Sequence, residues 1–133
     1  MDPIPRESTL EIVAGSHSWS KDWFLPTTFL SKEPKWFKEG SLPRAPDIDG
    51  DRKAHEIIGW ELNPRDVVAF HMLALHGSAG STALRRCFSV RMVGDDCRYT
   101  PREWLTSPQY EGLDDHLPAG SEMEHKLFPL LWS

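Results

Sequence analysis

The chain has 133 residues, which is enough for one domain with a real core but hardly enough for two. Fifteen basic and twenty acidic residues give a net charge of −5, which argues against a nucleic-acid partner. The longest nearly apolar run, residues 67–75, is less than half as long as the roughly twenty residues that a membrane span needs.

Residues 1–7 contain two acids, an arginine and two prolines, where a signal peptide would have an apolar stretch. The two cysteines, Cys87 and Cys97, have neither the spacing of a metal-binding pair nor the number of a disulfide framework. We therefore expect a cytoplasmic protein with free thiols, and neither a membrane nor a nucleic acid as partner.

Eleven prolines and nine glycines interrupt the chain, which favours short strands joined by loops over long helices. In chain order, strands are predicted at residues 9–13, 57–62, 66–75 and 83–93. The intervening turns and loops are expected at residues 14–17, 18–38, 40–53, 63–66, 76–81 and 94–96, and one helical turn at residues 101–105. Pro64 at the second position of the 63–66 turn favours type I. The pattern predicts a mainly β chain with long loops and little helix.

The last two predicted strands have the clearest patterns. Residues 66–75 are almost continuously apolar, as in a strand that is covered on both faces. In residues 83–93, the apolar side chains of Phe88, Val90 and Met92 alternate with polar ones. Four strands are enough for part of a sheet but few for a complete sandwich or barrel.

Three residues around the loop between these strands are candidates for chemistry. His76 ends the apolar run, Ser78 follows in a loop of small residues, and Arg85 begins the next predicted strand with Arg86 beside it. A neutral imidazole suits a divalent iron, and a guanidinium suits a two-pronged grip on a carboxylate. A single histidine at a strand end is more often structural, however, and an arginine in a strand more often lies at the surface or in an ion pair.

The order and spacing of these motifs resemble the C-terminal half of the phytanoyl-CoA dioxygenase family. The matching strings are residues 63–71, 75–78, 85–91, 94–96 and 98–99, together with residues 8–17, in which Ala14 replaces the usual proline. The resemblance implies a non-haem Fe(II), 2-oxoglutarate-dependent oxygenase that hydroxylates a small molecule. It also implies a double-stranded β-helix, which is a jelly-roll, cupin-like fold. Residues 1–133 would then be a single domain, the C-terminal portion of that β-helix without its N-terminal half.

The resemblance also implies roles for the candidate residues. His76 would be the second histidine ligand of the iron, and Arg85 would bind the far carboxylate of 2-oxoglutarate. We prefer Arg85 to Arg86 because Arg85 lies four residues before Ser89, as the family arginine lies before a similar small residue. Arg86 stays an alternative, since the preceding loop is slightly short. Ser78 would donate a hydrogen bond to the same carboxylate.

The sequence departs from the family at the first two iron ligands, which form a His-x-Asp motif. None of the six histidines is followed two residues later by Asp or Glu. The first residues, Met1, Asp2 and Pro3, look like the end of a string that follows that motif in the family. We therefore expect a truncated oxygenase that is inactive alone. The alternative is a non-catalytic carboxylate-binding module, or one completed by a second copy of the chain or by a missing N-terminal half.

Overall fold

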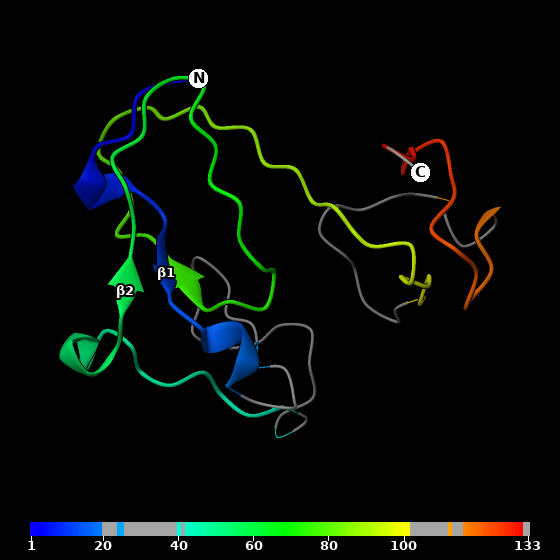
Figure 1. Ribbon diagram of the computed structural model, residues 1–133, viewed down its shortest axis with the longest axis horizontal. Coiled ribbons are helices and arrows are strands. Elements are labelled where there is room, and N and C mark those ends of the chain that lie inside the picture. The colour runs from blue at the N-terminus through cyan, green and yellow to red at the C-terminus, as the bar shows by residue number, and fades with distance from the viewer. Residues whose placement is uncertain (20–23, 26–39, 41, 102–111, 113–115, 132–133) are drawn as a thin grey trace. The chain divides into compact units, whose positions relative to one another are not determined.

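The computed structural model describes residues 1–19, 24–25, 40, 42–101, 112 and 116–131. They divide into two compact units, Met1–Phe88 and Ser89–Ser133, and each unit is described by itself. In the described residues the chain is mainly non-helical (Figure 1), and no helix among them is long and apolar enough to cross a membrane.

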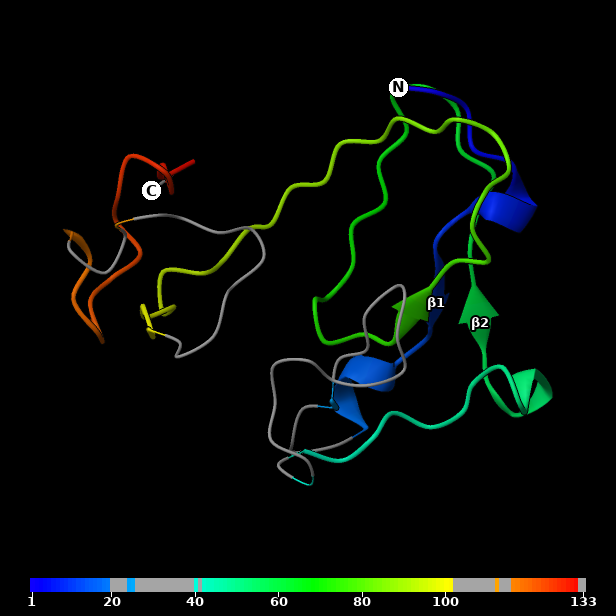
Figure 2. The same ribbon diagram turned by 180° about the vertical axis from the view of Figure 1, so that it is seen from behind.

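The first unit is built on a three-stranded antiparallel sheet in the order β2-β1-β3. The central strand β1 (Glu11–Val13) pairs with β2 (Ile57–Ile58) on one side and β3 (His76–Gly77) on the other, and β1 and β2 lie side by side in both views (Figures 1 and 2). The register pairs Ile12 with Ile58, Val13 with Ile57, Glu11 with Gly77, and Ile12 with His76. The prediction of a strand within residues 9–13 is confirmed. The predicted jelly-roll would need more strands than this three-stranded sheet contains.

The buried end of β1 is fastened to β3 by a serine hydroxyl. Ile12 and Val13 are buried, and the 3-10 turn η2 (Ser16–Ser18) follows them after Gly15, whose φ of 72° suits glycine. Buried Ser16 donates its hydroxyl to the Val13 carbonyl (2.7 Å) and accepts the amide of Leu75 (2.8 Å). The predicted turn after β1 is therefore present, and it also fixes the residue that leads into β3.

The charged edge of β1 ties two further 3-10 turns to the sheet. The carboxylate of Glu11 accepts hydrogen bonds from Arg6 (3.1 Å) in η1 (Arg6–Ser8) and from Arg52 (2.8 Å) in η3 (Arg52–Ala54). The hydrogen bond from Arg52 is the main reason that the pKa of Glu11 is lowered from its ordinary value. The carboxylate stays ionised and keeps both turns close to β1.

The second unit is joined mainly by backbone hydrogen bonds around Tyr99. Its amide donates to the Ser121 carbonyl (2.9 Å), and its carbonyl accepts from the Gly120 amide (2.7 Å). Leu117 is buried in this unit. The predicted turn at residues 94–96 is confirmed, because the Cys97 amide donates to the Gly94 carbonyl (3.1 Å). Most of the predicted loop 18–38 and of the predicted helical turn 101–105 lies outside the described residues.

Two predicted strands are wrong. Residues 66–75 and 83–93 form no strand, and apolar side chains in both stay exposed, including Val67 (85%) and Phe88 (79%). An alternating or apolar run becomes a strand only where a neighbouring strand satisfies its backbone groups. In the described part of the chain, residues 83–93 make one backbone–backbone hydrogen bond to a distant segment. In this bond the Asp2 amide donates to the Arg86 carbonyl (3.3 Å).

Two smaller predictions are also corrected. The loop expected at residues 76–81 begins with the strand β3, which pairs with β1. The turn at residues 63–66 is present, with the Asp66 amide donating to the Asn63 carbonyl (3.0 Å), but Arg65 has a φ of 90°. A positive φ at the third position belongs to type II rather than type I. The Asp66 carboxylate, which accepts the Asn63 amide (2.7 Å), braces this turn.

Replacing Ser16 by alanine tests the fastening of β1. We expect Ser16→Ala to lower the free energy of unfolding by about 1–3 kcal/mol, because the Val13 carbonyl and Leu75 amide both lose a buried partner. Urea denaturation measures this loss. Ser18→Ala is the matched control, since exposed Ser18 donates to the Gly15 carbonyl (2.8 Å) and has no other side-chain partner among the described residues, so water can replace this bond. Equal losses in the two variants would contradict a special role for Ser16.

Candidate functional site

His76, the predicted iron ligand, lies in β3 with its imidazole exposed. Its Nδ1 lies 2.7 Å from the Ala74 carbonyl oxygen. Because a carbonyl can only accept, Nδ1 must donate, and in the neutral ring the lone pair is then on Nε2. The ring of Phe70 meets the imidazole edge-on, with 5.0 Å between ring centroids. The ring is thus held in place, and its Nε2 has no hydrogen-bond partner among the described residues and could face a metal.

Ser78 and Arg85, the two predicted co-substrate residues, meet at one oxygen atom. The Ser78 hydroxyl donates to the Ser8 carbonyl (3.2 Å), and Nη1 of Arg85 donates to the same oxygen (2.7 Å). Ser78 lies two residues after His76, just beyond β3, and its own oxygen accepts the Gly80 amide (3.2 Å). The fold therefore brings together two side-chain donors that aim at a single acceptor.

Arg85 carries a positive charge that has no counter-ion in the described part of the chain. It is half-buried, and Nη1 is its only nitrogen with a hydrogen-bond partner among the described residues. A guanidinium has five N–H donors, arranged to match the two oxygens of a carboxylate. A half-buried cation that faces a neutral carbonyl keeps most of its capacity to bind an anion.

Arg86 has a different partner. Its Nε (3.1 Å) and backbone amide (2.8 Å) donate to Oδ2 of Asp2, and its Nη2 donates to Oδ1 (2.8 Å). The side-chain hydrogen bonds from Arg86, followed by the one from its amide, lower the pKa of Asp2 to about 2. Arg86 is therefore engaged with a carboxylate of the chain itself, whereas Arg85 is not engaged with any that the structure describes.

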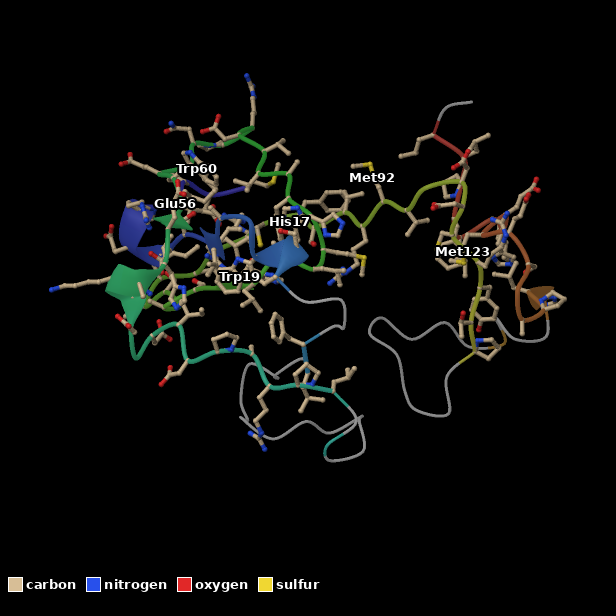
Figure 3. The ribbon with its side chains drawn as sticks, turned by 60° about the horizontal axis from the view of Figure 1, so that its bottom comes forward. His17, Trp19, Glu56, Trp60, Met92 and Met123 are labelled. Carbon is tan, nitrogen blue, oxygen red and sulfur yellow. The ribbon has the colours of Figure 1, made fainter. Side chains whose placement is uncertain are left out.

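The described residues do not assemble an iron site around His76. No group of three or more His, Cys, Asp or Glu side chains among them is placed to hold a metal ion. Three other histidines lie against rings: the ring centroids of His17 and His71 are 5.1 Å apart, and those of His55 and Trp19 are 5.5 Å apart. His17 and Trp19 are labelled in Figure 3. A single imidazole does not supply the two histidines and one carboxylate that Fe(II) needs in such oxygenases.

An open hollow of about 410 Å³ lies apart from the predicted site residues. It is bounded by two short segments: Trp60, Glu61 and Leu62, then Asp66, Val67, Val68 and Ala69. Trp60 is labelled in Figure 3. Neither His76, Ser78 nor Arg85 lines it.

Sequence reasoning missed two partners of the adjacent arginines Arg85 and Arg86. One is the Ser8 carbonyl, which as a backbone group leaves no signal in the sequence. The other is Asp2, which was interpreted only as the remnant of a family string, although its acidic side chain could have suggested a partner for one of the paired arginines. Comparisons of the chain with protein-family models, with curated proteins and with solved structures find no match.

The Asp2–Arg86 pair gives a pH prediction. The pKa of Asp2 is depressed in the folded chain, so its ionised form stabilises the fold above the ordinary value of about 4, and this contribution disappears as the pH falls from about 4 to about 2. Carboxyl carbon NMR should show a midpoint about 2 for Asp2. In Arg86→Gln the midpoint should rise toward the ordinary value but stay below it, because the backbone amide of residue 86 still donates to the carboxylate. An unchanged midpoint in that variant would exclude the Arg86 side chain as the main cause.

Proposed function

We propose that this chain carries the co-substrate half of a dioxygenase-type site, in which Arg85 and Ser78 bind a carboxylate of 2-oxoglutarate. The observation that carries the proposal is the convergence of both side-chain donors on the Ser8 oxygen (2.7 and 3.2 Å). A carboxylate oxygen accepts hydrogen bonds as that carbonyl does, and it adds a full negative charge. The resemblance to the phytanoyl-CoA dioxygenase family supports 2-oxoglutarate as the source of the carboxylate.

The energetic argument favours an anion over the neutral carbonyl. The hydrogen bond from Arg85 to the carbonyl is already strengthened by the charge of the guanidinium, and a carboxylate adds the attraction between opposite charges and a second, parallel N–H···O bond. Arg85 also has N–H donors to spare among the described contacts, so it can take both oxygens of a carboxylate. Ser78 would add one O–H donor beside it. Arg86 is less suited, because its fork is already filled by Asp2.

The described residues do not supply the ligand set that Fe(II) has in such oxygenases. We propose His76 as one ligand of an Fe(II) site whose other two ligands come from outside these residues. A second copy of the chain or a separate N-terminal segment would supply them and complete the jelly-roll. Hydroxylation of a small molecule belongs to that assembly. The chain by itself would be a carboxylate-binding β module.

Binding of 2-oxoglutarate tests the role of Arg85. We expect Arg85→Gln to weaken binding about ten- to hundredfold, because it removes a charge-assisted hydrogen bond worth about 1.5–3 kcal/mol. Isothermal titration calorimetry or ligand-observed NMR gives the Kd. The control is Arg91→Gln, which makes the same charge change at an exposed arginine with no partner among the described residues. The proposal fails if both variants bind like the parent chain.

A metal titration tests whether the chain has an iron site of its own. We expect anaerobic Fe(II) to change the Kd for 2-oxoglutarate by less than about twofold, because one imidazole does not fix a metal in the required geometry. The same calorimetric titration, with and without the metal, measures this. A tenfold tighter Kd would show that the chain assembles a complete iron site, and the proposed division of ligands would be wrong.

A further inference from the structure

Residues 1–8 form a strap that is held along the first unit by later segments of the chain, with its blue ribbon beside green and yellow-green segments in both views (Figures 1 and 2). At its start, Asp2 is held by the Arg86 side chain and amide. In its middle, Ile4 and Leu62 exchange two backbone hydrogen bonds of 2.8 and 2.9 Å. At its end, the Ser8 carbonyl accepts from Ser78 and Arg85. The third attachment uses the donors that we assign to the ligand.

We propose that the strap is an internal competitor, so that a carboxylate binds to Ser78 and Arg85 only when the Ser8 carbonyl leaves them. This inference rests on the proposed function and adds a mode of regulation to the same site. The ligand and the strap would occupy one set of donors in turn, and anything that loosens the strap would tighten binding.

The hydroxyl of Ser78 makes the two states exclusive. It has one proton, which it donates to the Ser8 carbonyl, and it cannot donate that proton to a ligand at the same time. Arg85 has further N–H groups, but its shortest contact, at 2.7 Å, goes to the same oxygen. A ligand that uses both residues must therefore displace this carbonyl.

The strap has a fixed end and a releasable end. Thr9, directly after the strap, is 1% exposed and leads into β1, so Ser8 leaves the donors only if the strap turns about this anchored end. The other end depends on an ion pair at the surface, where the Asp2 side chain is 23% exposed and that of Arg86 is 72% exposed. Removing the charge of Asp2 would raise the population in which residues 1–8 have left the donors. A ligand that binds only this population would then show a higher apparent affinity.

The substitution Asp2→Asn gives a result whose sign is diagnostic. If the strap competes, 2-oxoglutarate should bind at least about threefold more tightly to this variant than to the parent chain, because the competent fraction rises. If residues 1–8 only support the site, the variant should bind equally or more weakly. Glu7→Gln is the matched control, because it removes the same charge from the strap at an exposed residue with no partner among the described residues.

A second measurement uses the unaltered chain. The amides of Ile4 and Leu62 are bonded to each other's carbonyls, so their hydrogen exchange reports whether the strap is in place. Adding 2-oxoglutarate should speed exchange at both amides if the ligand displaces the strap. A ligand that binds while the strap stays in place would slow exchange at both amides. This readout holds even if Asp2→Asn unfolds the chain.

The outcomes separate the two proposals. Tighter binding to Asp2→Asn than to Glu7→Gln, or faster exchange with ligand, supports the competing strap. Binding by the parent chain with no gain in Asp2→Asn and with slowed exchange overturns the strap and leaves the proposed function standing. If neither the parent chain nor Asp2→Asn binds 2-oxoglutarate, the proposed function fails, and the strap inference fails with it.

Discussion

The arrangement of the first unit depends on the backbone of β1 (Glu11–Val13). Its apolar residues are buried, and buried backbone N–H and C=O groups must find partners. β2 supplies them on one edge and β3 on the other, and the Ser16 hydroxyl locks the start of β3 in place. Because β3 must pair there, Ser78 leaves the sheet close to Ser8, three residues before β1, and contacts its carbonyl. The candidate site thus results from the need of the β1 backbone groups for hydrogen-bond partners.

Neighbouring positions in the sequence acquire different chemistry from their partners. Arg85 and Arg86 are the same residue type one position apart, yet one donates to a neutral carbonyl and the other to a carboxylate. The guanidinium of Arg86 is filled by Asp2 and acts as a structural clamp, whereas that of Arg85 has most of its N–H donors unused among the described residues and suits an anion. The clamp and the proposed ligand site are also linked through the strap, because residues 1–8 are attached to both arginines.

The sequence was a good guide where a structural feature is local, and a poor one where a partner was needed. The strand around Ile12 and the turns at residues 63–66 and 94–96 were predicted, because β-branched residues, proline and glycine act on their own backbone. The strands at residues 66–75 and 83–93 were not formed, although their patterns are stronger than that of β1. A pattern reports what a segment could bury, but a strand needs a neighbour on its edge, and these segments have none in the described residues.

For the candidate site, the residue types in the sequence by themselves determined the available chemistry: an imidazole, three hydroxyls and two adjacent guanidinium groups within residues 76–86, and no His-x-Asp motif. Only the tertiary structure decided which guanidinium is already paired, because Asp2 is more than eighty residues away along the chain from Arg86. It also decided that Ser78 and Arg85 share one acceptor, since the Ser8 carbonyl is a backbone group that every residue possesses. Hydrogen bonds between distant segments are set by how the backbone is folded, and a sequence pattern does not record them.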